Sequence, residues 1–294
     1  FPPEAVEILS KLQGKAEPAP WEELRSVLVA ELGEEKIAQF ETLSTEPSAS
    51  ASIGQVHRAR LDGRDVAVKI QYPGVSDSVD SDLKILKAVA QSLLTLSGRR
   101  MDLDELFAEL ATVLNQEADY NLELANMKEY GSYLSGELDF AVPTPIESHS
   151  SRRVLTMSWE RGQPLNDCLK THPSREDRTK IGKRLLDLYT REFWDWGFVQ
   201  TDPNYGNFLI QAYPLKLVVL DFGATLRYPI EFRREYRQLM LAMGTGDPKK
   251  IVDVSIEHKL IDARESAESK EKLVAMMLLS LEPFDPKAQP FAFK

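Results

Sequence analysis

The sequence predicts an α+β protein of two lobes, with a β-rich first lobe that carries inserted helices and a mainly helical second lobe. Two β-like runs at 53–59 and 66–70 flank an Asp-Gly pair, which is typical of a β-hairpin. After Arg161 the pattern is mostly helical, with a long amphipathic segment at 175–196. A chain of 294 residues has room for two such lobes.

We expect three parts in chain order. They are an N-terminal helical extension (1–45), the first lobe (46–160) and the second lobe (161–294), whose natural end we expect to lie beyond this sequence. Apolar residues at helical or alternating spacing predict the elements inside these parts. The predicted elements are helices near 5–12, 21–32, 78–97, 102–130 and 175–196, strands at 153–157 and 215–220, and about three helices between Glu231 and Leu281.

Composition excludes several classes of function. Lys and Arg number 36 against 46 Asp and Glu, and the net charge of −10 disfavours a general nucleic-acid surface. One cysteine, Cys168, excludes an internal disulfide and a cysteine-based zinc site, and the four histidines show no metal-ligand spacing. No run approaches the roughly 20 apolar residues of a membrane span.

Two short motifs in the second lobe point to phosphoryl transfer. Asp221-Phe222-Gly223 follows a predicted strand, at whose end a carboxylate can reach Mg²⁺, and Asp202 and Asn207 have the spacing of a kinase catalytic loop. Phosphoryl transfer depends on positioning and charge neutralisation. We therefore expect Asn207 and Asp221 to bind the metal and Asp202 to accept a hydroxyl proton or orient a water. Either motif alone is more typical of turn or capping residues, but the pair favours a site.

Lys69 is the expected cation for the phosphates. It lies in an apolar strand, where an unpaired lysine is costly unless it reaches solvent at a sheet edge. Glu117 continues the apolar stripe of the helix predicted at 102–130, and a carboxylate on a buried stripe needs a cation. We therefore expect a Lys69–Glu117 ion pair. The alternative is that Glu117 lies at the margin of the stripe and extends into water.

Two further segments are candidates for binding the nucleotide. Ala49, Ser50, Ala51 and Ser52 stand in register with the start of the glycine-rich phosphate loop of kinases, with alanine at the first two glycine positions. Unlike glycine, alanine rarely adopts positive φ, and its methyl group keeps the backbone further from a phosphate. Met157 and Trp159, between the two lobes, are candidates for an adenine pocket. The alternative for 49–52 is a plain linker. The alternative for Met157 and Trp159 is an ordinary connector between the lobes.

The features of a protein-phosphorylating kinase are incomplete. Gln200 and Thr201 precede Asp202 where a kinase has His-Arg, so no catalytic-loop arginine is present to engage a phosphorylated segment. Only 224–230 separates Gly223 from the next predicted helix, which leaves little room for a peptide platform. Protein phosphorylation in trans is therefore disfavoured.

Five ordered segments resemble the UbiB/ADCK family of atypical protein kinase-like ATPases, and its mitochondrial, coenzyme Q-supporting branch most. They are 51–57, 68–75, 117–120, 200–204 and 220–225. The resemblance implies a two-lobed protein-kinase-like fold, binding of ATP and Mg²⁺, and ATPase activity. Matched by position, Lys69 is the nucleotide lysine, Glu117 and Asp119 form the E-x-D motif, and Asp202, Asn207 and Asp221 are the catalytic and metal residues. The family's K-x-G-Q motif would lie before Phe1.

The resemblance also implies a cellular role. We expect an atypical kinase or ATPase that supports coenzyme Q (ubiquinone) biosynthesis at a membrane surface, with lipid or phenolic quinone precursors and coenzyme Q biosynthesis proteins as partners. It would be peripheral, on the matrix side of the mitochondrial inner membrane or on the cytoplasmic face of a bacterial membrane. The alternative is a nucleotide-gated scaffold that organises lipid-biosynthesis enzymes. The oligomeric state is left open.

Overall fold

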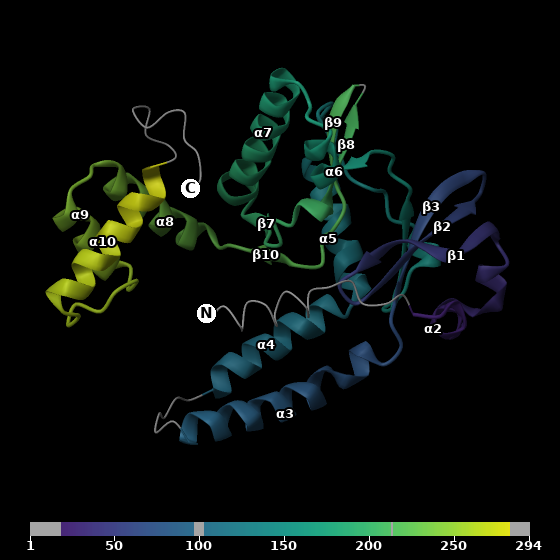
Figure 1. Ribbon diagram of the computed structural model, residues 1–294, viewed down its shortest axis with the longest axis horizontal. Helices are drawn as coiled ribbons and strands as arrows, with labels where there is room; N and C mark the ends of the chain where they lie inside the picture. Colours follow the sequence, from purple (N-terminus) through teal and green to yellow (C-terminus); the bar gives the residue numbers. More distant parts are fainter. Residues whose placement is uncertain (1–18, 97–102, 213, 283–294) are drawn as a thin grey trace. The chain divides into compact units, whose positions relative to one another are not determined.

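The computed structural model describes residues 19–96, 103–212 and 214–282 (Figure 1). The chain divides into two compact units. Unit 1 comprises Phe1–Leu188 and Gln200–Leu226, and unit 2 comprises Tyr189–Val199 and Arg227–Lys294. The helix predicted near 5–12 lies outside the described residues, and the lobe boundaries at 46 and 161 stay predictions.

Unit 1 contains a four-stranded antiparallel sheet of order β1-β2-β3-β5. Its strands are β1 (Phe40–Ala51), β2 (Gly54–Leu61), β3 (Arg64–Gln71) and β5 (Val154–Ser158). Asp62 and Gly63 both have positive φ in the two-residue turn between β2 and β3, which confirms the predicted hairpin. Strand β1 was not predicted, because register shifts along this strand remove the alternating pattern on which such predictions depend.

Helix α2 (Trp21–Ile37) covers one face of this sheet and confirms the helix predicted near 21–32. Its buried side chains pack against apolar residues of the strands to form the core on that face. The core consists of Leu24, Val27, Leu28 and Leu32 of α2 with Phe40, Ala59, Leu61, Val66, Val68, Ile70 and Val154. Alternation along β3 therefore directs Lys69 to the opposite face, away from α2.

Three helices follow β3: α3 (Val75–Leu96), α4 (Asp104–Glu117) and α5 (Tyr120–Tyr133). The single helix predicted at 102–130 is therefore wrong, because the chain breaks at Ala118 and Asp119. Asp119 has extended backbone angles, and its carboxylate accepts a hydrogen bond from the amide of Asn121 as an N-cap. The break changes which residues face the sheet.

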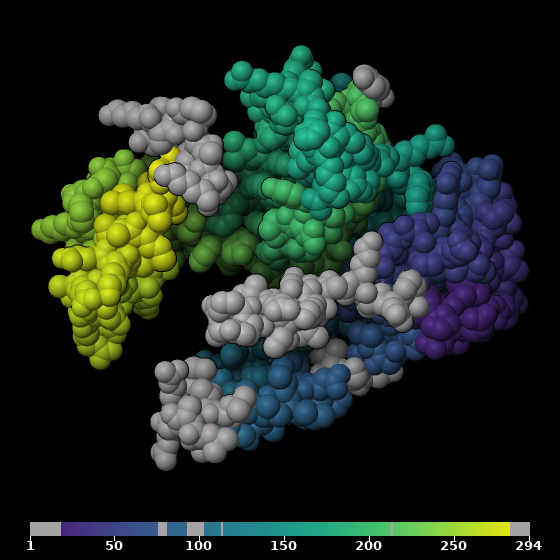
Figure 2. Space-filling model, in the orientation of Figure 1, coloured from purple at the N-terminus to yellow at the C-terminus, as the bar shows by residue number. Residues whose placement is uncertain are grey.

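Helices α3 and α4 lie side by side (Figure 1) and pack through Leu83, Leu103 and Phe107. Both helices, blue in Figure 2, also carry exposed apolar side chains. The exposed apolar residues there are Ile85, Leu86, Val89, Leu106, Leu110 and Leu114.

A second sheet in unit 1 has the order β4-β9-β8-β6. Its strands are β4 (Phe140–Ala141), β6 (Gln163–Pro164), β8 (Phe208–Ala212) and β9 (Leu215–Val219), of which β4 and β9 are parallel. The strand predicted at 215–220 is confirmed, whereas β8 was not predicted. The remaining short elements, in chain order, are η1 (Glu147–His149), α6 (Leu165–Lys170), β7 (Phe198–Gln200), η3 (Tyr205–Asn207) and β10 (Thr225–Arg227).

The helix predicted at 175–196 is present as α7 (Arg175–Thr190), continued by a π-helical turn η2 (Arg191–Trp196). Unit 2 then contains α8 (Ile230–Gly244), α9 (Pro248–Glu257) and α10 (Ala267–Leu281), which confirm the three helices predicted there. Their common core consists of Leu239, Ala242, Met243, Ile251 and Val274. Among the described helices of both units, none combines the length and apolar character needed to cross a membrane.

Replacement of Gly54 by alanine tests how closely β2 and β3 approach. A Cβ atom at Gly54 would lie 2.2 Å from the carbonyl oxygen of Ile70. We expect Gly54→Ala to lower the free energy of unfolding by about 1–3 kcal/mol, since the backbone has to move. Gly182→Ala is the control: nothing lies within 4 Å of its Cβ position, and alanine inside a helix is favoured by about 1 kcal/mol. Urea unfolding of both variants measures this, and an equal effect would contradict it.

Candidate active site

The pairing of the first sheet places two of the candidate nucleotide residues, Ala49 and Lys69, in one row. Ala49 pairs with Val56, Val56 with Lys69, and Lys69 with Leu155. Directly paired residues of antiparallel strands lie on the same face. The row therefore crosses β1, β2, β3 and β5 on the face opposite α2, with Lys69 near its centre.

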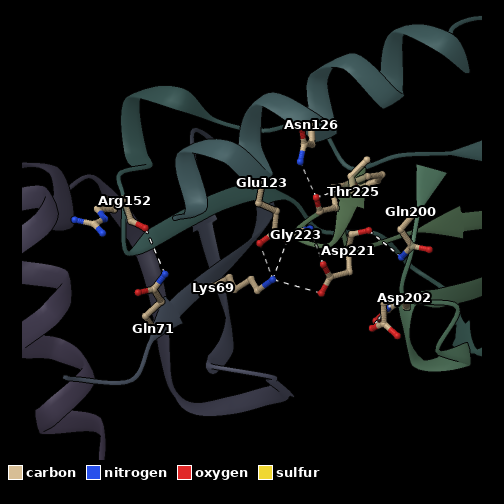
Figure 3. A network of polar contacts seen from close by, with 12 residues as sticks. Lys69, Gln71, Glu123, Asn126, Arg152, Gln200, Asp202, Asp221, Gly223 and Thr225 are labelled. Carbon is tan, nitrogen blue, oxygen red and sulfur yellow. Dashed lines mark hydrogen bonds and ion pairs between the residues drawn. The ribbon is translucent and has the colours of Figure 1, made fainter. Parts of the chain in front are cut away.

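Lys69 is buried and forms an ion pair with Glu123 of α5 (Figure 3). Its Nζ donates to both carboxylate oxygens of Glu123 at 2.8 Å, and the two side chains are 7% and 2% exposed. The carboxylate of Asp221 lies 3.6 Å away on the other side. The ring of Tyr120 lies 5.0 Å from Nζ, so a cation–π contact supplements the two acids.

Burial and neighbouring charge act in opposite directions on this pair. Burial alone would lower the pKa of Lys69, but Glu123 and Asp221 outweigh it and hold that pKa above its ordinary range. Burial raises the pKa of Glu123 to about 7, against the lowering effect of Lys69. Lys69 therefore remains a cation at neutral pH.

The predicted Lys69–Glu117 ion pair is wrong, because Glu123 is the partner of Lys69. The prediction extended one apolar stripe through a continuous helix, whereas Glu117 is the last residue of α4 and the chain turns after it. Beyond the break, the stripe restarts at Tyr120 and continues through Glu123, Met127 and Tyr130, all of which are buried.

Glu117 nevertheless lies close to the other candidate residues. Its Cγ is 4.0 Å from the position that a Cβ would take at Gly223, and Asp221 Oδ1 is 3.4 Å from the same point. Burial raises the pKa of Glu117, as do the charges of Asp221 and Asp202, while Lys69 lowers it. The structure thus gathers three acids at this place, and Glu117 experiences the repulsion of the other two.

Asp202 and Asn207 are brought together as the spacing predicts. The amide Nδ2 of Asn207 donates to Oδ2 of Asp202 at 2.9 Å and to its carbonyl oxygen at 3.2 Å. The short turn η3 sets this geometry, because the side chain of Asn204 accepts a hydrogen bond from the amide of Gly206. The amide oxygen of Asn207 consequently points away from Asp202.

Asp221 stands at the start of the loop Asp221–Ala224, which follows β9 and which we call the metal loop. The amide of Leu220 donates to the carbonyl oxygen of Asn207 at 2.9 Å, so the metal loop begins beside Asn207. Oδ1 of Asp221 accepts from the amide of Gly223 at 2.9 Å. Its Oδ2 faces Lys69.

The remaining candidates for nucleotide binding lie along the same sheet. Ala51 pairs with Gly54 across a two-residue turn that contains Ser52, so 49–56 forms the tip of the β1–β2 hairpin. Alternation places Ala49 and Ala51 on the face of Lys69 and Ser50 on the opposite face.

The proposed adenine residues follow on β5 and just after it. Met157 pairs with Ala67 of β3, on the Lys69 face. The guanidinium of Arg58 lies 5.2 Å from the ring centre of Trp159, which ties this residue to β2. The nucleotide roles of the hairpin, Met157 and Trp159 stay predictions.

The donor set fits magnesium that arrives with a nucleotide. Among residues 19–96, 103–212 and 214–282, no group of three or more His, Cys, Asp or Glu is placed to hold a metal ion by itself. Magnesium in nucleotide sites characteristically takes one or two protein oxygens together with phosphates and water. Asp221 Oδ2 and the amide oxygen of Asn207 are available for that arrangement.

Sequence reasoning missed four residues of this site. Glu123 could have been found, because an aspartate before Tyr120 is an N-cap signal, and a helix restarted there places Glu123 on its buried stripe. Asn126, Gln200 and Thr201 donate hydrogen bonds to carbonyl groups of the metal loop. No sequence pattern indicates these contacts, because they join residues far apart in the chain.

Comparison with known proteins places the chain in a family. The family model of the ABC1 atypical kinase-like domain matches residues 11–255, well over half of the sequence. The chain belongs to this family. The resemblance to UbiB/ADCK proteins and the predicted kinase-like α+β fold are thereby confirmed.

Two relatives with assigned names are each about one third identical to this chain. The chain is 34% identical to atypical kinase COQ8, mitochondrial, of Schizosaccharomyces pombe, over 96% of this chain and 46% of that protein. It is 35% identical to atypical kinase COQ8B, mitochondrial, of Rattus norvegicus, over 96% of this chain and 53% of that protein. The chain thus spans about half the length of these relatives.

A solved structure has a similar fold. It is that of Rv3197 from Mycobacterium tuberculosis, in complex with erythromycin. The TM-score is 0.73 at 28% identity, over 95% of this chain and 70% of that one.

The importance of the Lys69–Glu123 pair can be measured by removing one partner. We expect Glu123→Ala to lower the free energy of unfolding by about 3–5 kcal/mol, because it leaves a buried ammonium without its main partner. Glu147→Ala is the matched control, since it breaks an exposed pair between Lys128 of the same helix and Glu147 and should cost less than about 1 kcal/mol. Similar losses in chemical denaturation would show that the buried pair has no special weight.

A second prediction concerns the repulsion at Glu117. Because its pKa is raised in the folded protein, ionisation of Glu117 costs stability as pH rises above the unfolded value. We expect Glu117→Gln, which cannot ionise, to be more stable than the wild type at pH 8. The gain should vanish near pH 3, where the carboxyl is protonated in both states. Urea unfolding at both pH values, without nucleotide and with EDTA, tests this, and a gain independent of pH would contradict it.

Proposed function

We propose that this ABC1-family chain binds ATP with Mg²⁺ and transfers or hydrolyses the γ-phosphoryl group in support of coenzyme Q biosynthesis. The observation that carries the proposal is the buried Lys69–Glu123 pair with Asp221 at 3.6 Å from the same ammonium. A fixed cation beside a metal-binding carboxylate is what a polyphosphate requires. The similarity to proteins named atypical kinase COQ8 supports the connection with coenzyme Q.

Each residue has a distinct role in this proposal. Lys69, held in place by Glu123, binds the α- and β-phosphates, and Asp221 with Asn207 holds Mg²⁺. When bound, the ion neutralises the charge that develops on the phosphoryl oxygens. Asp202 accepts the proton of the attacking hydroxyl or orients a water, and the amide of Asn207 holds one of its carboxylate oxygens in place.

Glu117 is the third catalytic residue proposed from the sequence, where its expected role was to pair with Lys69. Since Glu123 is that partner, Glu117 needs another role. It does not orient Lys69, but its carboxylate faces the region of Asp221 and Asp202. Burial raises the pKa of Glu117, and the charges of Asp221 and Asp202 add to this effect; a cation bound among these acids would offset the contribution of the charges. We therefore assign Glu117 to the electrostatic environment of the metal.

A short segment connects the metal loop to α8, the next helix of the chain. Its length limits which substrates we propose. Only Ala224–Pro229 separates Gly223 from the first residue of α8. This segment is too short for an extended peptide-binding platform, so we propose that proteins are not phosphorylated in trans. The proposed substrates are water or a small lipid-linked molecule such as a phenolic quinone precursor. We propose that the protein acts peripherally at a membrane surface and that it is mitochondrial, since these relatives are named mitochondrial.

Removal of single carboxylates tests the assignment of roles. We expect Asp221→Asn to abolish phosphate release, because the metal loses its charged ligand, and Asp202→Asn to slow it by about 10²–10⁴. Asp167→Asn, at an exposed pair with Lys170, is the control and should match the wild type. Release of phosphate from γ-labelled ATP measures all three. Unchanged turnover in either site variant would remove that residue from the mechanism.

The same assay separates the possible reactions when it includes anionic liposomes with polyprenyl-phenol analogues. Free phosphate above the Asp221→Asn blank identifies an ATPase, and label on the lipid identifies a phosphotransferase. ATP binding without either product would favour a nucleotide-gated scaffold for biosynthetic enzymes.

A further inference from the structure

The backbone of the metal loop is held by side chains from two separate places in unit 1, helix α5 and the segment before Asp202 (Figure 3). Gln200 Nε2 donates to the carbonyl oxygen of Asp221 at 3.0 Å, and Asn126 Nδ2 donates to that of Phe222 at 3.0 Å. Thr201 binds the carbonyl oxygen of Ala224 through its hydroxyl and its backbone amide, each at 2.8 Å. Three of the four carbonyl groups of the metal loop are thereby fixed.

These contacts restrict where the carboxylate of Asp221 can point. Its carbonyl is held by Gln200 on one side, and its Oδ1 is held by the amide of Gly223 on the other. The ring of Phe222 is fully buried and lies 4.9 Å from the ring of Tyr130. Rotation of the Asp221–Phe222 peptide would therefore break contacts at both ends and turn Oδ2 away from Lys69.

Asn126 links the metal loop to the ion pair. It lies on α5, one turn after Glu123, so the helix that orients Lys69 also holds the carbonyl of Phe222. Helix α5 thus positions both Lys69, which we propose to contact the phosphates, and the loop of Asp221, which we propose to contact the metal. A displacement of α5 would disturb both together.

The donors in this arrangement are neutral. Kinases regulated by phosphorylation use a catalytic-loop arginine that pairs with a phosphate and orders the segment after the metal aspartate. Here Gln200 and Thr201 occupy the positions before Asp202, and both bind the metal loop directly. Gln200 is only 3% exposed, so water does not compete for its amide.

We propose that Gln200, Thr201 and Asn126 are positioning residues that keep the metal loop permanently in its metal-binding conformation, without phosphorylation of the chain. The inference rests on the proposed function, since it concerns how Asp221 meets Mg²⁺. In this proposal, Gln200 and Thr201 order the segment after Asp221. In kinases regulated by phosphorylation, a contact between an arginine and a phosphate orders that segment. The site is then regulated by its ligands and by the position of α5.

The test compares Gln200→Leu with a variant that restores a donor, Gln200→His. We measure the affinity of a fluorescent ATP analogue over a range of Mg²⁺ concentrations, and separately in EDTA. Gln200→Leu should raise the half-saturating Mg²⁺ concentration at least tenfold while affinity in EDTA changes less than twofold. Gln200→His should return the Mg²⁺ dependence to within about threefold of the wild type, because an imidazole N–H can donate to the same carbonyl.

Thr156→Val is the matched control. Thr156 is also buried and also donates to a backbone carbonyl group, that of His149, but it pairs with Val68 on the α2 face of the first sheet and does not touch the metal loop. It should lower thermal stability as Gln200→Leu does and leave the Mg²⁺ dependence unchanged. Asn126→Leu should resemble Gln200→Leu, and phosphatase treatment of the wild type should have no effect.

Distinct results would overturn the inference and the proposed function. Equal Mg²⁺ dependence in Gln200→Leu and wild type, or a parallel shift in Thr156→Val, would reduce Gln200 to a structural residue. A change in Mg²⁺ dependence after phosphatase treatment would contradict permanent assembly. If the wild type binds the analogue with Mg²⁺ but releases no phosphate, the proposed reaction fails while the positioning role still stands on the binding data.

Discussion

Placing the ammonium of Lys69 in the interior of unit 1 is the constraint on which the rest of the site depends. A buried lysine is costly unless a carboxylate with good geometry compensates the lost hydration. Glu123 supplies it by accepting two hydrogen bonds of 2.8 Å from Lys69, with Asp221 and the ring of Tyr120 completing the surroundings. Helix α5 must therefore lie where Glu123 reaches β3, which fixes the first sheet, α5 and the metal loop relative to one another within unit 1.

The break between α4 and α5 makes this arrangement possible. Asp119 begins a new helix, and the amide of Tyr120 donates to the carbonyl oxygen of Arg152 just before β5. Gln71 at the end of β3 donates to the carbonyl oxygen of Ala118. The break is thus tied to two strands of the sheet that carries Lys69. Because the chain changes direction here, Glu117 and Glu123 face the same site from two different helices.

The electrostatic balance of the site explains why a metal would complete it. Lys69 compensates Glu123, whereas Asp221, Asp202 and Glu117 leave an excess of negative charge at the site. Burial raises the pKa of Glu117, and the charges of Asp221 and Asp202 raise it further. A divalent cation with its nucleotide would bind where this excess lies. The neutral contacts of Gln200, Thr201 and Asn126 hold the loop without adding to the charge, so the acids remain available to the metal.

By itself the sequence determined the class of fold, the β2–β3 hairpin, the helices of unit 2 and the residue types of the candidate site. These features depend on local patterns: the Asp-Gly turn, helical spacing, and the five-residue interval from Asp202 to Asn207. Only the tertiary structure decided which glutamate pairs with Lys69 and which side chains hold the metal loop. The α4–α5 break shifted the buried stripe. The contacts of Asn126 with Phe222 and of Gln200 with Asp221 join distant segments, and no local pattern records which segments will meet.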